Sequence, residues 1–369
     1  MLSRAFVTKH QVRRNFNDHE ENSCRSMSIH EYEEFIIGFK QDVPLVFFDE
    51  NNDPNHNHGN PRLTLKEVLR ASAGVMGESH FGMTEKVVLL KGKICALKRF
   101  RKVVVKNSEF GKRIEKFARV SRECKQLVPI TAYLYSKRIK FVVSDYYPMG
   151  SLADLLSGAR DLGQTALEWK QRLKIILCIA NGLAFIHSQN QPKNQIKDHK
   201  DIYLNVHGNV KASNVMINID FTACLSDYGF AQLAEWTEFS DTWQKKPPLL
   251  EYLFSHELLS QKNDVYNFGI ILLDILGRQG MKKEEMENME FEFIVQGKER
   301  KQAFNVLNIA LSCTNSDQEA RPTMEEIVIY LGDVLRSGRW SVLTLLYRAM
   351  LPSPDFVKFS LSSEFGGFR

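Results

Sequence analysis

The chain carries its most informative segment at Val206-His-Gly-Asn-Val-Lys-Ala-Ser-Asn214, and Asp227-Tyr-Gly229 comes thirteen positions after Asn214. The hydrophobic pattern differs on the two sides of this region. Short strand-like runs fill much of the chain before Ser151, whereas apolar residues recur at spacings of three and four over most of the chain after it. This pattern predicts an α+β fold in which a small β-rich lobe precedes a larger, mainly helical lobe.

The small lobe is predicted to contain two strand pairs and one main helix. Lys-Gly-Lys at 91–93 indicates a tight hairpin, and Thr64 with Glu67 has the spacing of a helix capping box. Apolar residues three and four positions apart in Phe110–Phe117 predict a helix laid against the sheet. The predicted strands are Lys86–Leu90, Ile94–Phe100, Leu127–Tyr135 and Lys140–Tyr146.

Five helices are expected in the large lobe. Ser151 is a candidate N-cap for a short helix through Leu156, and Thr323 with Glu326 repeats the capping-box spacing. Amphipathic periodicity predicts three further helices, over 169–183, 265–275 and 306–313.

Composition argues against several classes of protein. The 49 Lys and Arg against 44 Asp and Glu leave a formal net charge of only +5, and no basic stretch is interleaved with aromatic residues, so we expect no nucleic-acid binding. The six cysteines lack metal-ligand spacing and indicate buried, reduced thiols. The longest apolar runs, 175–186 and 268–276, are interrupted by polar residues and are too short to span a bilayer.

The first 62 residues are expected to form a weakly ordered leader and linker. Asn, Asp, Pro, Gly and His crowd the segment 49–61, and the start of the chain lacks the apolar core of a secretory signal. The predicted divisions are 1–62 for leader and linker, 63–147 for the small lobe, 148–337 for the large lobe and 338–369 for a C-terminal tail.

Five motifs in a fixed order resemble the signature set of protein kinases. Gly-Glu-Ser-His-Phe-Gly at 77–82 stands in the place of the glycine-rich loop, and Cys-Ala-Leu-Lys at 95–98 resembles Val-Ala-Ile-Lys. The segment 206–214 has the spacing of the catalytic loop His-Arg-Asp-Leu-x-x-x-x-Asn, and Asp-Tyr-Gly at 227–229 resembles Asp-Phe-Gly. The fifth group is structural: Asp-Val-Tyr-Asn-Phe-Gly at 264–269, an acid before it and Arg-Pro-Thr at 321–323.

This resemblance implies roles for individual residues. In the catalytic loop, Asn209 takes the position of the base and Lys211 that of a phosphate contact. The residues implied for ATP are Gly77, Ser79, Gly82, Ala96, Lys98, Ser144 and Tyr146, and those implied for Mg²⁺ are Asn214 and Asp227. The implied structural residues are Arg113, His207, Asp264, Glu257 and Arg321, the last two as an ion pair. Both ATP and Mg²⁺ are left open as ligands.

Several segments are more narrowly similar to the cytoplasmic part of plant leucine-rich-repeat receptor-like kinases, in particular to atypical members that carry His-Gly-Asn. They include Leu-Val-Phe-Phe-Asp at 45–49, Val-Pro-Ile-Thr-Ala-Tyr at 128–133 and Asp-Tyr-Tyr-Pro-Met-Gly-Ser-Leu at 145–152. The similarity covers residues 43 to 336. Neither the repeats nor the transmembrane helix of those receptors is found in this sequence, and we expect a protein without them.

Two substitutions bear on catalysis. Asn209 stands where the family presents an aspartate, and an amide cannot accept a proton, whereas a general base contributes about 10²–10⁴-fold to rate. Arg113 stands where a helix glutamate pairs with the strand lysine, and Glu115 lies about 140° from Phe110 around the helix and points away. Because Arg113 repels Lys98, we expect that lysine to pair with Asp227 or a phosphate.

Together these features predict a pseudokinase, which acts as a scaffold or allosteric partner of receptor-like kinases or other signalling proteins. The expected location is the cytoplasm, at the inner face of the plasma membrane. Two alternatives stay open: a slow serine/threonine kinase with another proton acceptor, and a truncated relative without function.

Overall fold

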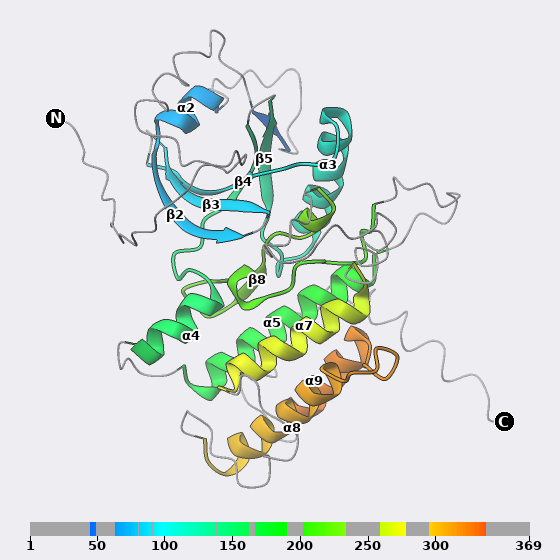
Figure 1. Ribbon diagram of the computed structural model, residues 1–369. Helices are drawn as coiled ribbons and strands as arrows, with labels where there is room; N and C mark the ends of the chain where they lie inside the picture. The colour runs from blue at the N-terminus through cyan, green and yellow to red at the C-terminus, as the bar shows by residue number, and fades with distance from the viewer. Residues whose placement is uncertain are drawn as a thin grey trace, which may run out of the picture. The chain divides into compact units, whose positions relative to one another are not determined.

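The small lobe is built on a six-stranded antiparallel sheet with the order β1-β5-β6-β4-β3-β2 in the part of the chain that the structure describes (Figure 1). The structure, a computed structural model, describes residues 45–48, 63–79, 81–89, 92–136, 139–161, 167–189, 202–233, 259–277 and 295–336. These residues all belong to one compact unit, 43–369. The strands are β1 (Val46–Phe47), β2 (Ser72–Ser79), β3 (Gly82–Val88), β4 (Ile94–Phe100), β5 (Ile130–Tyr135) and β6 (Lys140–Asp145).

The predicted hairpin between β3 and β4 is present, but its turn starts earlier than expected. β3 ends at residue 88, whereas the sequence predicts a strand to residue 90. The backbone N–H of Leu89 donates to the carbonyl oxygen of Lys93 at 2.9 Å, which closes the connection. In the register of this pair, Val88 lies opposite Ile94 and Lys98 lies opposite Thr84.

β1 precedes residue 63, at which the sequence predicts the small lobe to begin. Val46 pairs with Tyr133 of β5, and Phe47 pairs with Ala132. The ring of Phe48 stacks on the ring of Tyr133, with 5.6 Å between the centroids. The sheet therefore includes a short piece of the predicted leader.

Two helices accompany the sheet, α2 (Leu65–Arg70) and α3 (Asn107–Glu123). The predicted capping box at α2 is confirmed, since the N–H of Glu67 donates to Thr64 Oγ1 at 3.3 Å and the N–H of Thr64 donates to Glu67 Oε2 at 2.9 Å. α3 packs on β5 and buries Phe110, Ile114 and Phe117 completely. The predicted apolar face of this helix is confirmed.

The large lobe contains the five predicted helices: α4 (Leu152–Asp161), α5 (Trp169–His187), α7 (Gln261–Ile275), α8 (Gly297–Cys313) and α9 (Met324–Arg336). α5 and α7 lie next to each other, α8 packs on α7, and α9 packs on α5 (Figure 1). The predicted caps are present, since Ser151 Oγ accepts from the N–H of Asp154 at 3.2 Å and Thr323 Oγ1 accepts from the N–H of Glu326 at 3.2 Å. The α+β architecture with two lobes is thus confirmed.

A short hairpin of the large lobe joins the two segments that the sequence singles out. It consists of β7 (Val215–Ile217) and β8 (Ala223–Leu225), flanked by the short helices η1 (Ala212–Asn214) and η2 (Phe230–Gln232). Cys95, Cys124, Cys178, Cys224 and Cys313 are free and buried, as predicted for the described cysteines. Among the described helices, none is long and apolar enough to cross a bilayer.

Candidate functional site

A cavity of about 270 Å³ lies between the two lobes and brings together most of the predicted site residues. Its small-lobe wall is formed by β2, β3, β4 and β6, and its large-lobe wall by residues of 211–216 and 226–230. The predicted residues that line it are Gly77, Ser79, Ala96, Lys98, Ser144, Lys211, Asn214 and Asp227. Positions far apart in the sequence therefore meet in one cleft.

One part of the cavity lining is formed by the apolar side chains of Ala96, Tyr147 and Met216. Ala96 lies opposite Ser144 in the β4–β6 pair, so two small side chains face each other in the sheet. Concave apolar surfaces with a few polar groups are typical of small-ligand sites. These apolar side chains suit the uncharged part of a small ligand.

Two predicted nucleotide residues are not part of the cavity lining. The ring of Tyr146 lies under the ammonium of Lys86, with 4.7 Å between Nζ and the ring centroid, and the next residue, Tyr147, lines the cavity instead. Gly82 has φ +147°, and a Cβ there would approach the carbonyl oxygen of Arg99 to 1.8 Å. The packing of β3 on β4 thus requires a glycine at this position, whatever the cavity holds.

Lys98 forms the polar centre of the cavity. Its ammonium lies 3.0 Å from Asp227 Oδ2, and it donates to Thr84 Oγ1 at 3.2 Å and to Ser79 Oγ at 3.3 Å. The lysine is only 7% exposed, so its two hydroxyl acceptors and the nearby charge of Asp227 replace the water that it loses on burial. The expected pairing of Lys98 with Asp227 is confirmed.

Lys211 is a second cation in the same cavity. Burial lowers the pKa of its ammonium, with Asp227 opposing that shift and Lys98 adding to it. Within the described part of the chain, no hydrogen bond or ion pair of the Lys211 side chain is present. The side chain of Lys211 can therefore contact an anionic ligand in the cavity, although burial disfavours its charge.

Arg113 is buried and does not contact Lys98. Its Nε lies 2.8 Å from Glu109 Oε1, and its Nη1 donates to the carbonyl oxygen of Gln232 at 2.9 Å. Glu115 is exposed and lies 3.9 Å from Arg119, as the helical geometry predicts. The position that usually supplies a carboxylate to the strand lysine thus ties α3 to η2.

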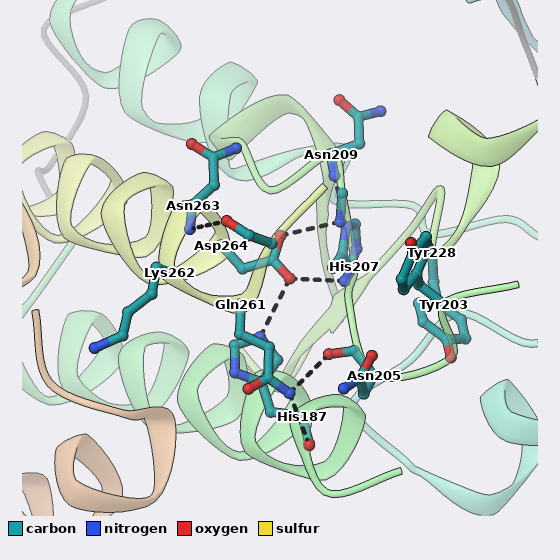
Figure 2. Close-up of polar contacts among 12 residues, drawn as sticks. His187, Tyr203, Asn205, His207, Asn209, Tyr228, Gln261, Lys262, Asn263 and Asp264 are labelled. Carbon is teal, nitrogen blue, oxygen red and sulfur yellow. Dashed lines mark hydrogen bonds and ion pairs between the residues drawn. The ribbon is translucent and has the colours of Figure 1, made fainter. Parts of the chain in front are cut away.

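Asp264 binds the backbone of the segment 206–214. Its carboxylate accepts the backbone N–H of His207 at 2.7 Å and that of Gly208 at 3.0 Å, and it lies 3.2 Å from His187 Nε2 (Figure 2). Gln261 Nε2 adds bonds to the carbonyl oxygens of His187 and Asn205. Asp264 is fully buried, so these donors are what makes its charge tolerable there.

The buried ring of His207 binds the backbone of the same segment. Its Nδ1 accepts the backbone N–H of Asn209 at 3.2 Å, and Asn214 Nδ2 donates to the carbonyl oxygen of Asn209 at 2.9 Å. Burial lowers the pKa of His207, against the opposing charges of Asp264 and Asp227. The side chain of Asn209 points away from Asp264 (Figure 2), and its Nδ2 is buried without a hydrogen-bond partner among the described residues.

The predicted metal ligands Asn214 and Asp227 both line the cavity. Mg²⁺ is usually held by one or two protein oxygens together with water and substrate phosphates, so an amide and a carboxylate at these positions fit its chemistry. Asp227 Oδ2 also lies 3.0 Å from the ammonium of Lys98. Within the described residues, no group of three or more His, Cys, Asp and Glu is placed to hold a metal. A metal at these two residues stays a prediction.

Glu257 lies outside the described residues, so its expected ion pair with Arg321 stays a prediction. The side chain of Arg321 donates to the carbonyl oxygens of Asn315 and Lys262.

The sequence motifs did not indicate several residues that line the cavity or hold its other residues in place. These residues are Thr84, Tyr147, His187 and Gln232. Thr84 is the one with a usable signal, because the register of the β3–β4 hairpin places it opposite Lys98.

Comparison with solved structures supports the fold. The pseudokinase domain of BIR2, an immune regulator of the RLK/Pelle family, superposes with a TM-score of 0.61 at 23% identity, over 81% of this chain and 92% of that chain. The kinase domain of maize SIRK1, a sucrose-induced receptor kinase bound to AMP-PNP, gives 0.60 at 24% identity, over 79% and 99%.

Curated relatives are receptor kinases of Arabidopsis thaliana. The probable inactive receptor kinase RLK902 is 33% identical over 303 residues, which cover 74% of this chain and 44% of the relative. The probable inactive receptor kinase At3g08680 is 32% identical over 318 residues, covering 80% and 46%. The chain thus spans less than half the length of these relatives. Residues 72–331 match the family described as protein tyrosine and serine/threonine kinase, so the chain belongs to the protein kinase family, among relatives that are plant receptor-like kinases.

Proposed function

We propose that this chain is a pseudokinase that binds a nucleotide between its lobes and transfers phosphate at no useful rate. The observation that carries the proposal is Asn209, which stands at the position of the proton acceptor. The segment 206–214 contains no carboxylate, so no other side chain of the loop replaces the missing base. The relatives named probable inactive receptor kinases support the same conclusion.

The missing base is the largest single loss. An amide can hydrogen-bond a substrate hydroxyl but cannot take up its proton, and general-base catalysis is worth about 10²–10⁴-fold in rate. The loop geometry around Asn209 is otherwise maintained, because Asp264 and His207 hold its backbone. The chain has therefore kept the frame of the site while losing its proton acceptor.

The cavity supports nucleotide binding. Ala96, Tyr147 and Met216 suit the base, while Lys98 and Lys211 place two ammonium groups where a phosphate chain can reach them. A bound ATP supplies a transferable phosphoryl group, and the residues of this chain bind and orient it. We therefore include nucleotide binding in the proposed function.

We infer that the output of the protein is a contact with other proteins, as a scaffold or allosteric partner of receptor-like kinases. The curated relatives are named receptor kinases. A kinase fold that lacks the proton acceptor loses catalytic turnover but keeps the surfaces that partner proteins can bind. The proposed place of action is the cytoplasm, at the inner face of the plasma membrane.

A radiolabel transfer assay tests the central claim. Wild type and Asp227→Asn are purified in parallel and incubated with labelled ATP and a generic protein substrate. We expect both to give the same background. Label on serine or threonine above that of Asp227→Asn would overturn the pseudokinase assignment.

The second candidate is a slow serine/threonine kinase with another proton acceptor. It is favoured by one observation: Lys98, Lys211 and Asp227 still meet in one cavity. The same assay separates the two functions, because a slow kinase loses its activity in Asp227→Asn and gains activity in Asn209→Asp. A pseudokinase of the proposed kind gives no activity for Asp227→Asn to remove.

A further inference from the structure

The positive charge of the chain is concentrated in one stretch of the small lobe. Residues 99–140 contain 13 Lys and Arg and only 3 Asp and Glu, whereas the whole chain contains 49 and 44. The remainder of the chain therefore contains 36 basic and 41 acidic residues. The small net charge of the chain is thus the sum of a strongly basic stretch and a slightly acidic remainder.

The fold brings the two ends of this stretch together at the start of α3. The hydroxyl of Tyr135 donates to the carbonyl oxygen of Val105 at 3.2 Å, and its ring centroid lies 5.2 Å from that of Phe110. The end of β5 therefore lies beside the connection from β4 to α3. α3 itself is at one edge of the small lobe (Figure 1). We call residues 101–106 together with the exposed face of α3 the basic surface.

The acidic side chains near the basic surface are mostly engaged in ion pairs. Each pair also uses one arginine, so arginines and acids largely cancel. Glu123 is the acid of the stretch outside these pairs, and Arg122 beside it donates to the carbonyl oxygen of Ala118. The ion pairs are Glu78–Arg101, Glu85–Arg99, Glu109–Arg113 and Glu115–Arg119.

Exposed lysines supply the excess charge of the basic surface. Lys112 and Lys116 are one helical turn apart on α3, where like charges repel each other. Within the described part of the chain, no hydrogen bond or ion pair of the Lys106, Lys112 or Lys116 side chain is present. An anionic partner would relieve the repulsion between them. The exposed lysines of the stretch are Lys102, Lys106, Lys112, Lys116 and Lys125.

The connection from β4 to α3 adds an apolar side chain to the basic surface. Val104 is 57% exposed and stands between Lys102 and Lys106 in the chain. Its backbone N–H donates to the carbonyl oxygen of Leu233 at 3.0 Å, so the backbone is fixed while the side chain meets solvent. Lysines are point charges without the bidentate geometry of arginine, and they suit a fluid layer of phosphate headgroups. Lysines around an exposed apolar side chain favour an anionic bilayer over an acidic peptide as the partner.

We propose that the basic surface binds an anionic phospholipid bilayer, with the lysine ammonium groups at the headgroups and Val104 at the boundary with the acyl chains. The inference goes beyond the proposed pseudokinase function, because it requires neither a nucleotide nor phosphate transfer. It gives the proposed location at a membrane a physical cause.

Sedimentation of the full chain with vesicles tests the inference, once with phosphatidylcholine alone and once with about 30% phosphatidylserine added. We expect binding to the anionic vesicles to be at least about tenfold tighter and to be lost in about 0.5 M salt, which screens exposed charges. Equal binding to both kinds of vesicle, or binding to neither, overturns the inference. Both results leave the radiolabel assay and the pseudokinase assignment as they are.

Removal of charge locates the surface. The variant with Lys106→Gln, Lys112→Gln and Lys116→Gln should bind anionic vesicles about a hundredfold more weakly, at about fivefold for each charge. The matched control has the same net charge and should bind within about twofold of wild type, because its exposed lysines lie in the large lobe. Equal loss in both variants would show attraction by net charge alone and overturn the inference. The control substitutions are Lys170→Gln, Lys298→Gln and Lys301→Gln.

Two further measurements separate the bilayer from other partners. Val104→Ser should weaken binding to anionic vesicles about fivefold, because less apolar surface leaves water. Unchanged affinity would overturn the contact of Val104 with the bilayer. Poly-glutamate serves as an acidic peptide: if it binds through the same three lysines while vesicles do not bind, the partner is an acidic protein segment and the membrane inference fails. Thermal unfolding verifies that each variant is folded.

Discussion

The guanidinium of Arg113 donates a hydrogen bond of 2.9 Å to the backbone carbonyl oxygen of Gln232, and so joins α3 to the segment after Asp-Tyr-Gly. Gln232 is itself fixed, because its side chain exchanges hydrogen bonds of 2.8 and 2.9 Å with the backbone of Tyr203. The buried guanidinium of Arg113 therefore links two elements of the fold.

Arg113→Met should lower the free energy of unfolding by about 1–3 kcal/mol, because a buried carbonyl oxygen and Glu109 both lose their donor. Urea unfolding followed by circular dichroism measures the change. Arg119→Met is the matched control: Arg119 is exposed and lies 3.9 Å from Glu115, so its loss should stay within about 0.5 kcal/mol. Equal effects in both variants would contradict the structural role of Arg113.

Asp264→Asn should destabilise the protein by about 3 kcal/mol, because an amide offers one oxygen where the carboxylate serves the N–H groups of His207 and Gly208. Asp333→Asn, on an exposed ion pair with Arg336, serves as the control and should be nearly neutral. Chemical unfolding of the three proteins gives the comparison. An unchanged midpoint for Asp264→Asn would show that the anchor does not stabilise the loop.

Gly208→Ala should cost about 1–2 kcal/mol. Gly208 has φ +77°, and a Cβ there would lie 2.6 Å from Cδ2 of Leu259, so both strain and contact oppose a side chain. Gly74→Ala is the control, because a Cβ at that strand position meets nothing within 4 Å. Thermal unfolding should separate the two variants; a Gly208→Ala protein as stable as Gly74→Ala would be unexpected.

Acid should destabilise the protein through His207. Burial lowers the pKa of this ring in the folded state, while the unfolded side chain takes up a proton near its ordinary pKa of about 6.5. Because the unfolded chain then binds more protons, stability is complete above about pH 6.5 and falls below it, by at most about 1.4 kcal/mol per pH unit for this group.

Unfolding of wild type and His207→Gln across this pH range isolates that contribution. The variant should be less stable at neutral pH, because it loses packing, yet its stability should fall less steeply in acid. The rest of the sequence is common to both proteins. Parallel pH curves would show that His207 does not titrate on unfolding.

The sequence predicted the helices better than the strand ends, for a physical reason. Apolar spacing in Phe110–Phe117 and the cap at Thr323 are local signals, and both appear as expected. The end of β3 depends on how two strands align. The prediction from Lys-Gly-Lys at 91–93 therefore placed the start of the turn two residues too late. β1 was not recognised as a strand, because two residues carry no periodicity and depend on pairing with β5.

The site shows the same division between local and long-range information. The resemblance to the kinase motifs predicted that Lys98, Lys211, Asn214 and Asp227 would meet, and helical geometry predicted that Glu115 would point away. The partner of Arg113 could not be predicted, since the carbonyl oxygen of Gln232 is a backbone atom that any residue supplies. His187 was missed because a single histidine at the end of α5 carries no motif.

Lys98 contacts Ser79, Thr84 and Asp227, so its substitution affects folding as well as ligand binding. Replacing this lysine with alanine to make a ligand-blind protein would also strand a carboxylate in a nearly dry interior, and the resulting damage to folding would be mistaken for lost recognition. Lys211, which supports no neighbour among the described residues, is the position at which loss of binding can be measured apart from loss of fold.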